Sequence, residues 1–266
     1  MLEVLLTNDD GIEAAGLQAL RRALGDLDGV RLEVIAPDGN RSATARSITT
    51  RRPLLVTEVD FGDGTVGYAT DGTPVDCVRL AQLGLIDGLN VDLVVSGINH
   101  GANLGDDITY SGTVAAALEA LILGVPGIAV SQQSRGRELD FSDTSGFDFD
   151  VAAAFVARLV DSLASQPLPP GTLLNINVPG VTPVGVELTR LGKRIYNDEL
   201  RLVREEGAGR HFWVYGNAPG FRDEPGTDLA AVAAGRIALT PIHFDLTDLP
   251  GIEVLREFEL ERLLDG

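Results

Sequence analysis

Cysteines, lysines and long hydrophobic runs are nearly or wholly missing from this sequence of 266 residues. Because Cys77 is the only cysteine, an intramolecular disulfide is excluded, and we expect Cys77 to fill space on an apolar helix. No apolar run approaches the roughly 20 residues that a membrane-spanning helix needs. The first residues also lack the basic and apolar segments of a secretion signal. We therefore expect a cytoplasmic protein with no membrane partner.

Positive charge is scarce as well. Lys193 is the only lysine, and the net charge is −18 at pH 7. An acidic surface of this kind repels nucleic-acid backbones and anionic membranes, so we expect no nucleic-acid polymer as a partner. A small anionic ligand would need a local source of positive charge. Four arginines between Asp38 and Arg52 offer one such source, and the alternative is that they lie on a solvated loop.

Alternating apolar runs and amphipathic stretches predict an α/β fold. Residues 2–6 and 31–36 indicate strands and residues 14–24 a helix, and this change of period from 2 to 3.6 and back implies parallel strands. The alternation continues with helices at 73–83, 113–123 and 147–163 and with strands at 93–95, 127–130 and 173–178. The order predicts a Rossmann-like, doubly wound and mostly parallel sheet.

Residues 53–60 and 65–70 indicate two paired strands joined by a turn. The sequence GDGTVG at residues 62–67 matches the dinucleotide-binding fingerprint G-x-G-x-x-G. That fingerprint must follow a buried strand and begin a helix, whereas strand-like residues continue here. We therefore interpret Gly62 and Gly64 as turn residues of a hairpin.

The regular alternation ends near residue 183. Strand-like runs without a convincing helix follow from 186 to 215, and residues 207–209 resemble a hairpin tip. A small apolar segment at 227–234, a strand at 237–241 and a helix at 255–264 complete the chain. We divide the sequence into a Rossmann-like α/β domain, 1–183, and a β-hairpin-rich extension, 184–266. Because protruding hairpins often pair with another subunit, we expect the extension to mediate oligomerisation.

Two carboxylates, Asp9 and Asp10, directly follow the first predicted strand. Gly11 lets the chain turn, so both can face one site, where a divalent cation would relieve their repulsion. Asn99 ends another predicted strand and Ser42 lies in the loop after the second, so all four converge on one sheet edge. Their oxygen atoms favour Mg²⁺, Mn²⁺ or Ca²⁺ over Zn²⁺. The alternative for the aspartates is an Asx turn with a helix cap.

Residues 93–119 join a buried strand to an alanine-rich helix through a long polar loop, which is typical of a functional loop. Free N–H groups at the helix start suit an anion such as phosphate. We expect phosphoryl oxygens to be contacted by Asn103, Ser111, Gly112 and Thr113. The alternative is that Ser111 or Thr113 serves only as a helix cap.

Ordered motifs along essentially the whole chain resemble the signature blocks of the SurE family, the survival-protein metal-dependent nucleotidases. The blocks are Thr7-Asn8-Asp9-Asp10-Gly11, Ala36-Pro37-Asp38, Asn40-Arg41-Ser42, Gly72-Thr73-Pro74, Ser96-Gly97-Ile98-Asn99, Gly101, Asn103-Leu104-Gly105-Asp106-Asp107, Tyr110-Ser111-Gly112-Thr113, Asn175-Ile176-Asn177-Val178-Pro179, Gly226-Thr227-Asp228 and Thr240-Pro241. One departure is Ala43, where the family usually has glycine, and this change could alter loop mobility or substrate preference.

The resemblance implies a divalent-metal phosphatase that hydrolyses nucleoside monophosphates to nucleoside and phosphate. It implies that the metal ligands are Asp9, Asp10, Ser42 and Asn99. Mg²⁺ or Mn²⁺ would be the cofactor, with Ca²⁺ an option in a crystal. Asp9 and Asp10 would be the catalytic residues, since they hold the metal and one of them also orients the attacking water. The resemblance further implies a swapped C-terminal extension in a homodimer or homotetramer.

Three other functions share features with this sequence. A phosphoaccepting receiver domain needs an aspartate where Asn99 stands and a nearby lysine, but Lys193 lies in the extension. A non-catalytic metal- or nucleotide-binding module stays open, as does a broad acid phosphatase or exopolyphosphatase. No general acid is assigned, because His100, His211 and His243 are each better explained as structural residues.

Overall fold

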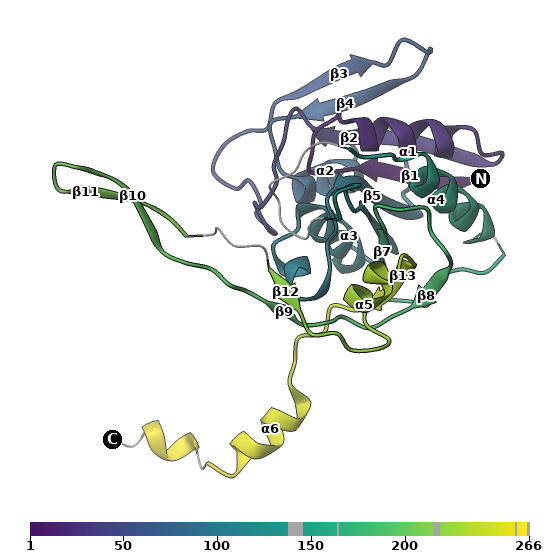
Figure 1. Ribbon diagram of the computed structural model, residues 1–266. Helices are drawn as coiled ribbons and strands as arrows, with labels where there is room; N and C mark the ends of the chain where they lie inside the picture. Colours follow the sequence, from purple (N-terminus) through teal and green to yellow (C-terminus); the bar gives the residue numbers. More distant parts are fainter. Residues whose placement is uncertain (138–145, 164, 215–218, 259, 265–266) are drawn as a thin grey trace.

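The computed structural model describes residues 1–137, 146–163, 165–214, 219–258 and 260–264 (Figure 1). A nine-stranded sheet forms the centre of the fold. In spatial order its strands are β3 (Val56–Asp60), β4 (Val66–Thr70), β2 (Val30–Pro37), β1 (Leu2–Thr7), β5 (Leu93–His100), β6 (Gly127–Gln132), β7 (Leu173–Val178), β13 (Ile237–Ile242) and β8 (Val186–Leu188).

The strands from β4 through β7 in this order are mutually parallel. Strand β3 pairs antiparallel with β4, and β13 pairs antiparallel with β7. The predicted mixed and mostly parallel α/β sheet is confirmed. The β3–β4 pair also confirms the hairpin at GDGTVG, since Gly62 and Gly64 have φ values of +77° and +87° that suit turn glycines.

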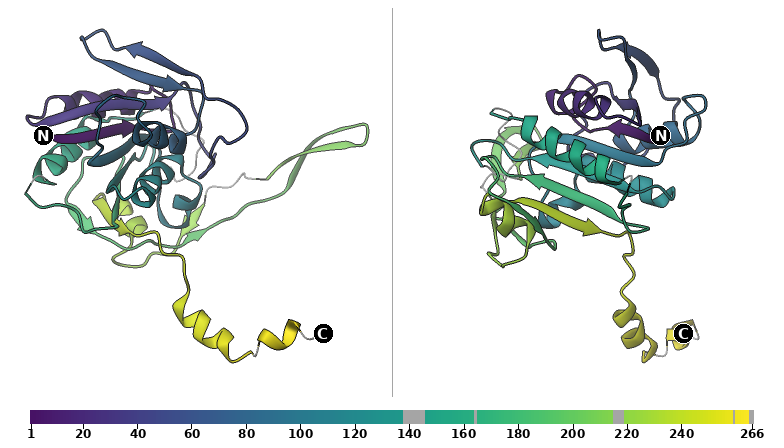
Figure 2. Two further views of the ribbon diagram at one scale, coloured as in Figure 1. Left: turned by 180° about the vertical axis from the view of Figure 1, so that it is seen from behind. Right: turned by 90° about the vertical axis from the view of Figure 1, so that its right-hand side faces the viewer.

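Helices cover both faces of the sheet (Figure 2). Helices α1 (Ala15–Gly25) and α4 (Asp150–Leu163) pack on one face. Helices α2 (Pro74–Gln82) and α3 (Gly112–Ile122) pack on the other. This arrangement explains why β5, β6 and β7 are almost wholly buried and lack polar alternation.

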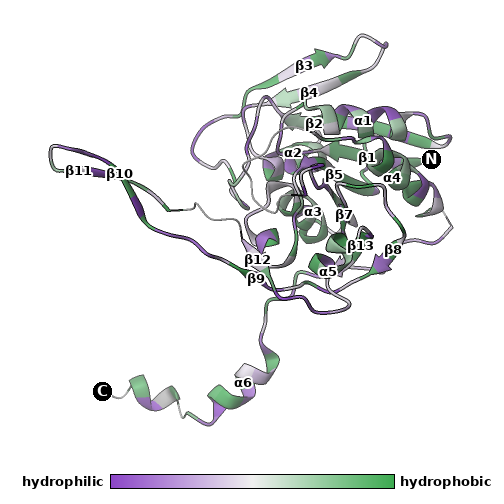
Figure 3. Cartoon of the chain, in the orientation of Figure 1, coloured by the Kyte–Doolittle hydropathy of each residue, from purple (hydrophilic) through white to green (hydrophobic). Residues whose placement is uncertain are grey.

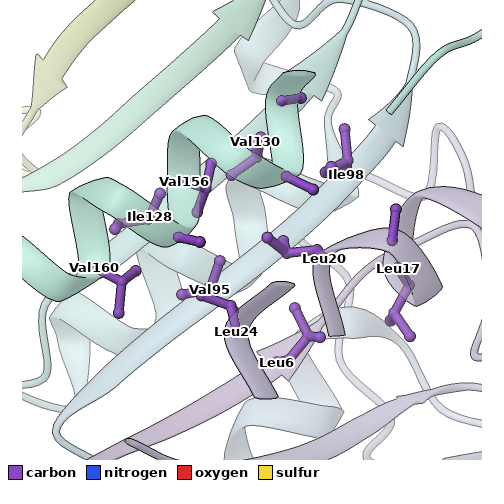
Figure 4. Close-up of a cluster of buried hydrophobic side chains, with 14 of the residues drawn as sticks. Leu6, Leu17, Leu20, Leu24, Val95, Ile98, Ile128, Val130, Val156 and Val160 are labelled. Atoms are coloured by element: carbon purple, nitrogen blue, oxygen red, sulfur yellow. The ribbon is translucent and has the colours of Figure 1, made fainter. Parts of the chain in front are cut away.

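Successive residues of a strand point to opposite faces, and β1 shows how this divides the core. Leu6 belongs to the same buried cluster as Leu20 of α1 and Val156 of α4 (Figure 4), whereas Leu5 belongs to a second cluster with Cys77 of α2. Burial raises the pKa of Cys77 to about 12. The thiol therefore stays protonated at neutral pH, and the expectation that it fills space in the core is confirmed.

The C-terminal part adds strands to the main sheet and also contains elements that project from the body. Strands β8 and β13 join the main sheet, and a short pair forms from β9 (Arg194–Ile195) and β12 (Gly220–Phe221). The hairpin of β10 (Arg201–Glu206) and β11 (Gly209–Trp213) extends away from the body, as does α6 (Leu249–Arg256) (Figure 1). The division at residue 183 stays a prediction, and Tyr215, the end of the predicted strand-like run, lies outside the described residues.

Two predicted boundaries were wrong, and one helix was not predicted. Strand β5 was expected to end at residue 95 but runs to His100, because small and polar residues continue the pairing with β6 across an irregularity. The small apolar segment at 227–234 contains a helix, α5 (Asp228–Ala233), whose start Thr227 caps. The final helix was expected at 255–264, but α6 ends at Arg256 and only a 3-10 turn, Leu260–Leu264, follows. Among the described residues, no helix has both the length and the apolar character needed to cross a membrane.

Candidate active site

The Asp9–Asp10 turn lies at the carboxyl end of β1 and is braced by Asn8. The buried Asn8 side chain donates from Nδ2 to the Gly11 carbonyl oxygen at 2.9 Å and accepts from the Gly11 N–H at 3.2 Å. Helix α1 does not begin until Ala15, and its N-cap residue, Ala14, makes no side-chain cap. Asn8 therefore stabilises the turn as an Asx-type residue. The side chains of Asp9 and Asp10 are not needed for the turn or for capping α1.

Asp10 is held by residues from two other segments. Its Oδ2 accepts from the backbone N–H of His100 at 3.1 Å and lies 2.9 Å from the Nδ1 of that ring. Its Oδ1 accepts from Asn40 Nδ2 at 3.4 Å. The His100 ring in turn packs edge-on against Phe147 and Phe149. These contacts fix the orientation of Asp10 and bring the ends of β1 and β5 together.

Asp9 is buried against the first turn of α3. Its Oδ1 accepts from the Thr113 hydroxyl at 2.6 Å. A Cβ added to Gly112 would lie 2.7 Å from Asp9 Oδ2, so only glycine permits this approach. Burial, followed by repulsion from Asp10, raises the pKa of Asp9 to about 6, against an ordinary value of 3.8.

The other two predicted metal ligands belong to neighbouring segments. Asn99 is in β5, next to His100, and its Nδ2 donates to the Gly101 carbonyl oxygen, which leaves the amide oxygen as the available acceptor. Ser42 is exposed in the loop after β2. Its backbone N–H donates to Asn40 Oδ1 at 2.8 Å, and the same Asn40 side chain donates to Asp10. Asn40 thus links the Ser42 loop to the aspartate pair.

The start of α3 is organised by caps as well as by Asp9. Ser111 is the N-cap and accepts from the Val114 N–H at 3.1 Å. The Thr113 hydroxyl is engaged by Asp9, so the side chains of Ser111 and Thr113 both have structural partners. Helix capping and phosphate binding by backbone N–H groups are compatible, and the phosphoryl contacts at Ser111, Gly112 and Thr113 stay a prediction.

Asn103 is fully embedded in the ends of β6 and β7. Its Nδ2 donates to Ser131 Oγ at 2.8 Å, and its carbonyl oxygen accepts from both Asn175 and Asn177. Its backbone N–H donates to Asn177 Oδ1. These bonds anchor the loop between β5 and α3, and the role of Asn103 in substrate binding stays a prediction.

The same loop is also tied to the C-terminal extension. Buried Asp107 forms an ion pair with Arg194 and accepts from the Tyr196 hydroxyl at 2.7 Å. Asp106 accepts from Lys193 Nζ at 2.8 Å. The only lysine of the chain therefore has a structural partner near the site, and the base of the extension helps to hold the loop that leads into α3.

The donor set suits a hard divalent cation. Two adjacent carboxylates, one buried with a raised pKa, form a site with excess negative charge that a cation would offset. Within the described part of the chain, no three His, Cys, Asp or Glu side chains gather into a metal site. The predicted set does not need such a group, because an amide oxygen and a hydroxyl complete it. Oxygen donors of these kinds fit Mg²⁺ or Mn²⁺.

Three of the four arginines of the predicted cluster are neutralised by carboxylates. Arg41 pairs with Asp38, Arg46 with Glu119, and Arg52 with Asp71. A cavity of about 420 Å³ lies beside the ends of β6 and β7, and its lining includes Gln132, the strand partner of His100. None of the predicted site residues is among the described residues that line this cavity.

Comparison with known proteins identifies the family of the chain. The sequence model of the family described as "Survival protein SurE" matches residues 4–198, which is more than half of the chain and contains all of the predicted site residues. The chain belongs to the SurE family. The resemblance inferred from the ordered motifs is thereby confirmed.

Similar proteins match over nearly their full lengths. A protein of Rubrobacter xylanophilus named 5'-nucleotidase SurE is 52% identical and aligns over 99% of both chains. A 5'-nucleotidase SurE of Chloroflexus aggregans is 47% identical over 97% of this chain and 99% of its own. The crystal structure of the SurE protein from Aquifex aeolicus superimposes with a TM-score of 0.80 at 36% identity, over 97% of this chain and 99% of that one.

Three residues that shape the site were not predicted from the sequence. Asn8 and Asn40 lie inside motif blocks. Nothing in the sequence indicates that Asn8 bonds to Gly11, or that Asn40 bonds to both Asp10 and Ser42. His100 was explained as structural, whereas the structure places its backbone N–H and ring on Asp10. The sequence did contain one indication of their importance: Asn40 and His100 lie close in the sequence to the predicted metal ligands Ser42 and Asn99.

Proposed function

We propose that this protein is a divalent-metal-dependent 5'-nucleotidase that hydrolyses nucleoside monophosphates to nucleoside and phosphate. The observation that carries the proposal is the contact of Asp9, the sequence neighbour of Asp10, with the first turn of α3. Paired carboxylates provide a place for a cation, and the helix start provides N–H donors for an anion. An acidic protein needs both features to attract a phosphate ester.

In the proposed mechanism, Asp9, Asp10, Asn99 and Ser42 would hold the cation through oxygen atoms. The chemistry supplied by a bound Mg²⁺ or Mn²⁺ would be neutralisation of phosphoryl charge and a lower pKa for the attacking water. Asp10, fixed by His100 and Asn40, would orient that water. The helix start at Ser111, Gly112 and Thr113, with Asn103 nearby, would contact the phosphoryl oxygens and stabilise their charge.

We also propose that the C-terminal extension joins subunits into a homodimer or homotetramer. The hairpin exposes Leu202, Val203, Phe212 and Trp213, and the terminal segment exposes Leu255 and Phe258. Both projecting elements carry hydrophobic stretches, drawn in green in Figure 3. Apolar side chains on projecting elements have little to pack against within one chain, so a second copy would bury them. Sedimentation as a monomer at micromolar concentration would refute this part of the proposal.

Phosphate release from AMP, measured with Mg²⁺ or Mn²⁺ and again with EDTA, tests the activity. We expect turnover that EDTA removes and added metal restores. Asp10→Asn should abolish turnover while circular dichroism shows an intact fold. AMP binding without phosphate release would favour the non-catalytic module instead. A panel with p-nitrophenyl phosphate and short polyphosphate, run beside AMP, distinguishes a nucleotidase from a broad acid phosphatase or exopolyphosphatase.

A further inference from the structure

The loop that carries Ser42 has two unusual backbone positions. Ala43 and Ala45 adopt positive φ values of 57° and 50°, a region that costs a residue with a Cβ about 1 kcal/mol or more. The side-chain and backbone hydrogen bonds of Ser42 and Thr44 stay within the loop, to Asn40 and Arg41. Such a conformation needs contacts at the ends of the loop to hold it.

The two ends of this loop are attached to Asp9 and to α3, the helix that packs against Asp9. At the first end, the Arg41 N–H donates to the Asp9 carbonyl oxygen at 2.6 Å. At the second, Arg46 donates to Glu119 of α3 at 2.6 Å. Glu119 lies seven residues, or about two turns, beyond Gly112 on one helix face. The helix that packs against Asp9 at its start therefore also holds the Ser42 loop two turns later.

Glu119 is a buried carboxylate with two arginine partners. Its side chain is 1% exposed, and Arg79 of α2 pairs with its other oxygen, also at 2.6 Å. A buried carboxylate is stable only when it is paired, so both ion pairs should persist in solution. The Arg46 guanidinium also lies 4.7 Å from the centre of the Phe244 ring, which belongs to the segment after β13. Arg46 is thus held on two sides.

We infer that Arg46 is a positioning residue that fixes the Ser42 loop over the active site through Glu119. This inference rests on the proposed function in one respect, namely that Ser42 contributes to cation binding. Arg46 itself is not expected to touch substrate or metal, because its guanidinium is occupied by Glu119 and Phe244. Loss of the contact should loosen residues 42–46 and weaken cation binding while Asp9 and Asp10 stay in place.

Arg46→Met and Arg79→Met form a matched pair for the test. Each variant removes one of the two ion pairs to Glu119, both 2.6 Å long, but only Arg46 belongs to the Ser42 loop. Mn²⁺ affinity is measured by titration calorimetry on the full-length protein. Hydrogen exchange at residues 42–46 is measured without metal. Arg46→Lys, which keeps the charge, should retain most of the affinity that Arg46→Met loses. If Arg46→Met fails to fold, Arg46→Gln, which removes the charge but keeps a polar side chain, replaces it.

We expect Arg46→Met to raise the Mn²⁺ dissociation constant about tenfold, the lower range for residues that orient metal ligands. Exchange in the loop should become faster, and KM for AMP should rise more than kcat falls. Arg79→Met should lose similar thermal stability but keep wild-type Mn²⁺ affinity and loop exchange. Equal effects of the two variants on affinity, or no effect of either, would overturn the inference. If the wild-type protein binds no Mn²⁺, the proposed function fails, and loop exchange alone then decides whether Arg46 restrains the loop.

Discussion

Asp9→Asn should make the metal-free protein more stable at neutral pH while it removes activity. Asp9 is 3% exposed, and its pKa is raised to about 6, chiefly by burial and then by Asp10. Asparagine keeps an oxygen that can accept from Thr113 and removes the buried negative charge. The substitution therefore relieves a cost that the wild-type site carries whenever no cation is bound.

The size of the stability gain and its dependence on pH follow from the difference in the Asp9 pKa between the folded and unfolded chains. Below about pH 4, Asp9 is protonated in both the folded and unfolded chains, so the wild type and Asp9→Asn should have similar stability. Between about pH 4 and 6 the unfolded wild-type chain loses this proton while the folded one keeps it, so wild-type stability falls as pH rises. A shift from 3.8 to about 6 corresponds to about 3 kcal/mol at higher pH. For a chain of this size, that is about 6 °C in Tm.

Thermal unfolding of both proteins at several pH values, in EDTA, measures this difference. Exposed Asp28→Asn is the control for a simple loss of surface charge. At a Mn²⁺ concentration of 100 times Kd, the wild-type protein should gain about 2.7 kcal/mol, and Asp9→Asn should gain little. The reasoning is refuted if Asp9→Asn is no more stable than the wild type at pH 8 without metal, or if its advantage persists unchanged at pH 4.

Three further substitutions test individual features of the site. Ala43→Gly removes the cost of a positive φ at 57° and should raise the free energy of unfolding by less than about 1 kcal/mol, seen as a higher urea midpoint; a lower midpoint would contradict the assigned conformation. Gly112→Ala places a Cβ 2.7 Å from Asp9 Oδ2 and should sharply reduce kcat for AMP, so wild-type kinetics would show that α3 does not pack on Asp9. His100→Ala removes a ring contact to Asp10 and should lower Mn²⁺ affinity or activity at least about tenfold, with unchanged values indicating that the ring only fills space.

Local patterns predicted most of the fold. Alternating periods located the strands and helices of the α/β region, and the requirement that a dinucleotide fingerprint begin a helix correctly removed GDGTVG from consideration. Errors fell where local preference and tertiary context disagree. Gly97, Asn99 and His100 have weak strand propensity, yet pairing with β6 extends β5 through them. Helix α5 was not predicted, because its segment is short and its helix is stabilised by the Thr227 cap and by packing of Leu229.

The sequence by itself determined the kinds of atoms available at the site and the strand ends that carry them. Asp9, Asp10 and Asn99 follow from motif order, because parallel strands must bring their carboxyl ends to one edge. Only the tertiary structure decided which partners fix those atoms. The contacting residues lie between 30 and 104 positions apart in the sequence. The contacts are Asn40 and His100 with Asp10, Thr113 with Asp9, and Arg46 with Glu119. Such contacts depend on how helices and loops pack over the sheet, and no local period or spacing encodes them.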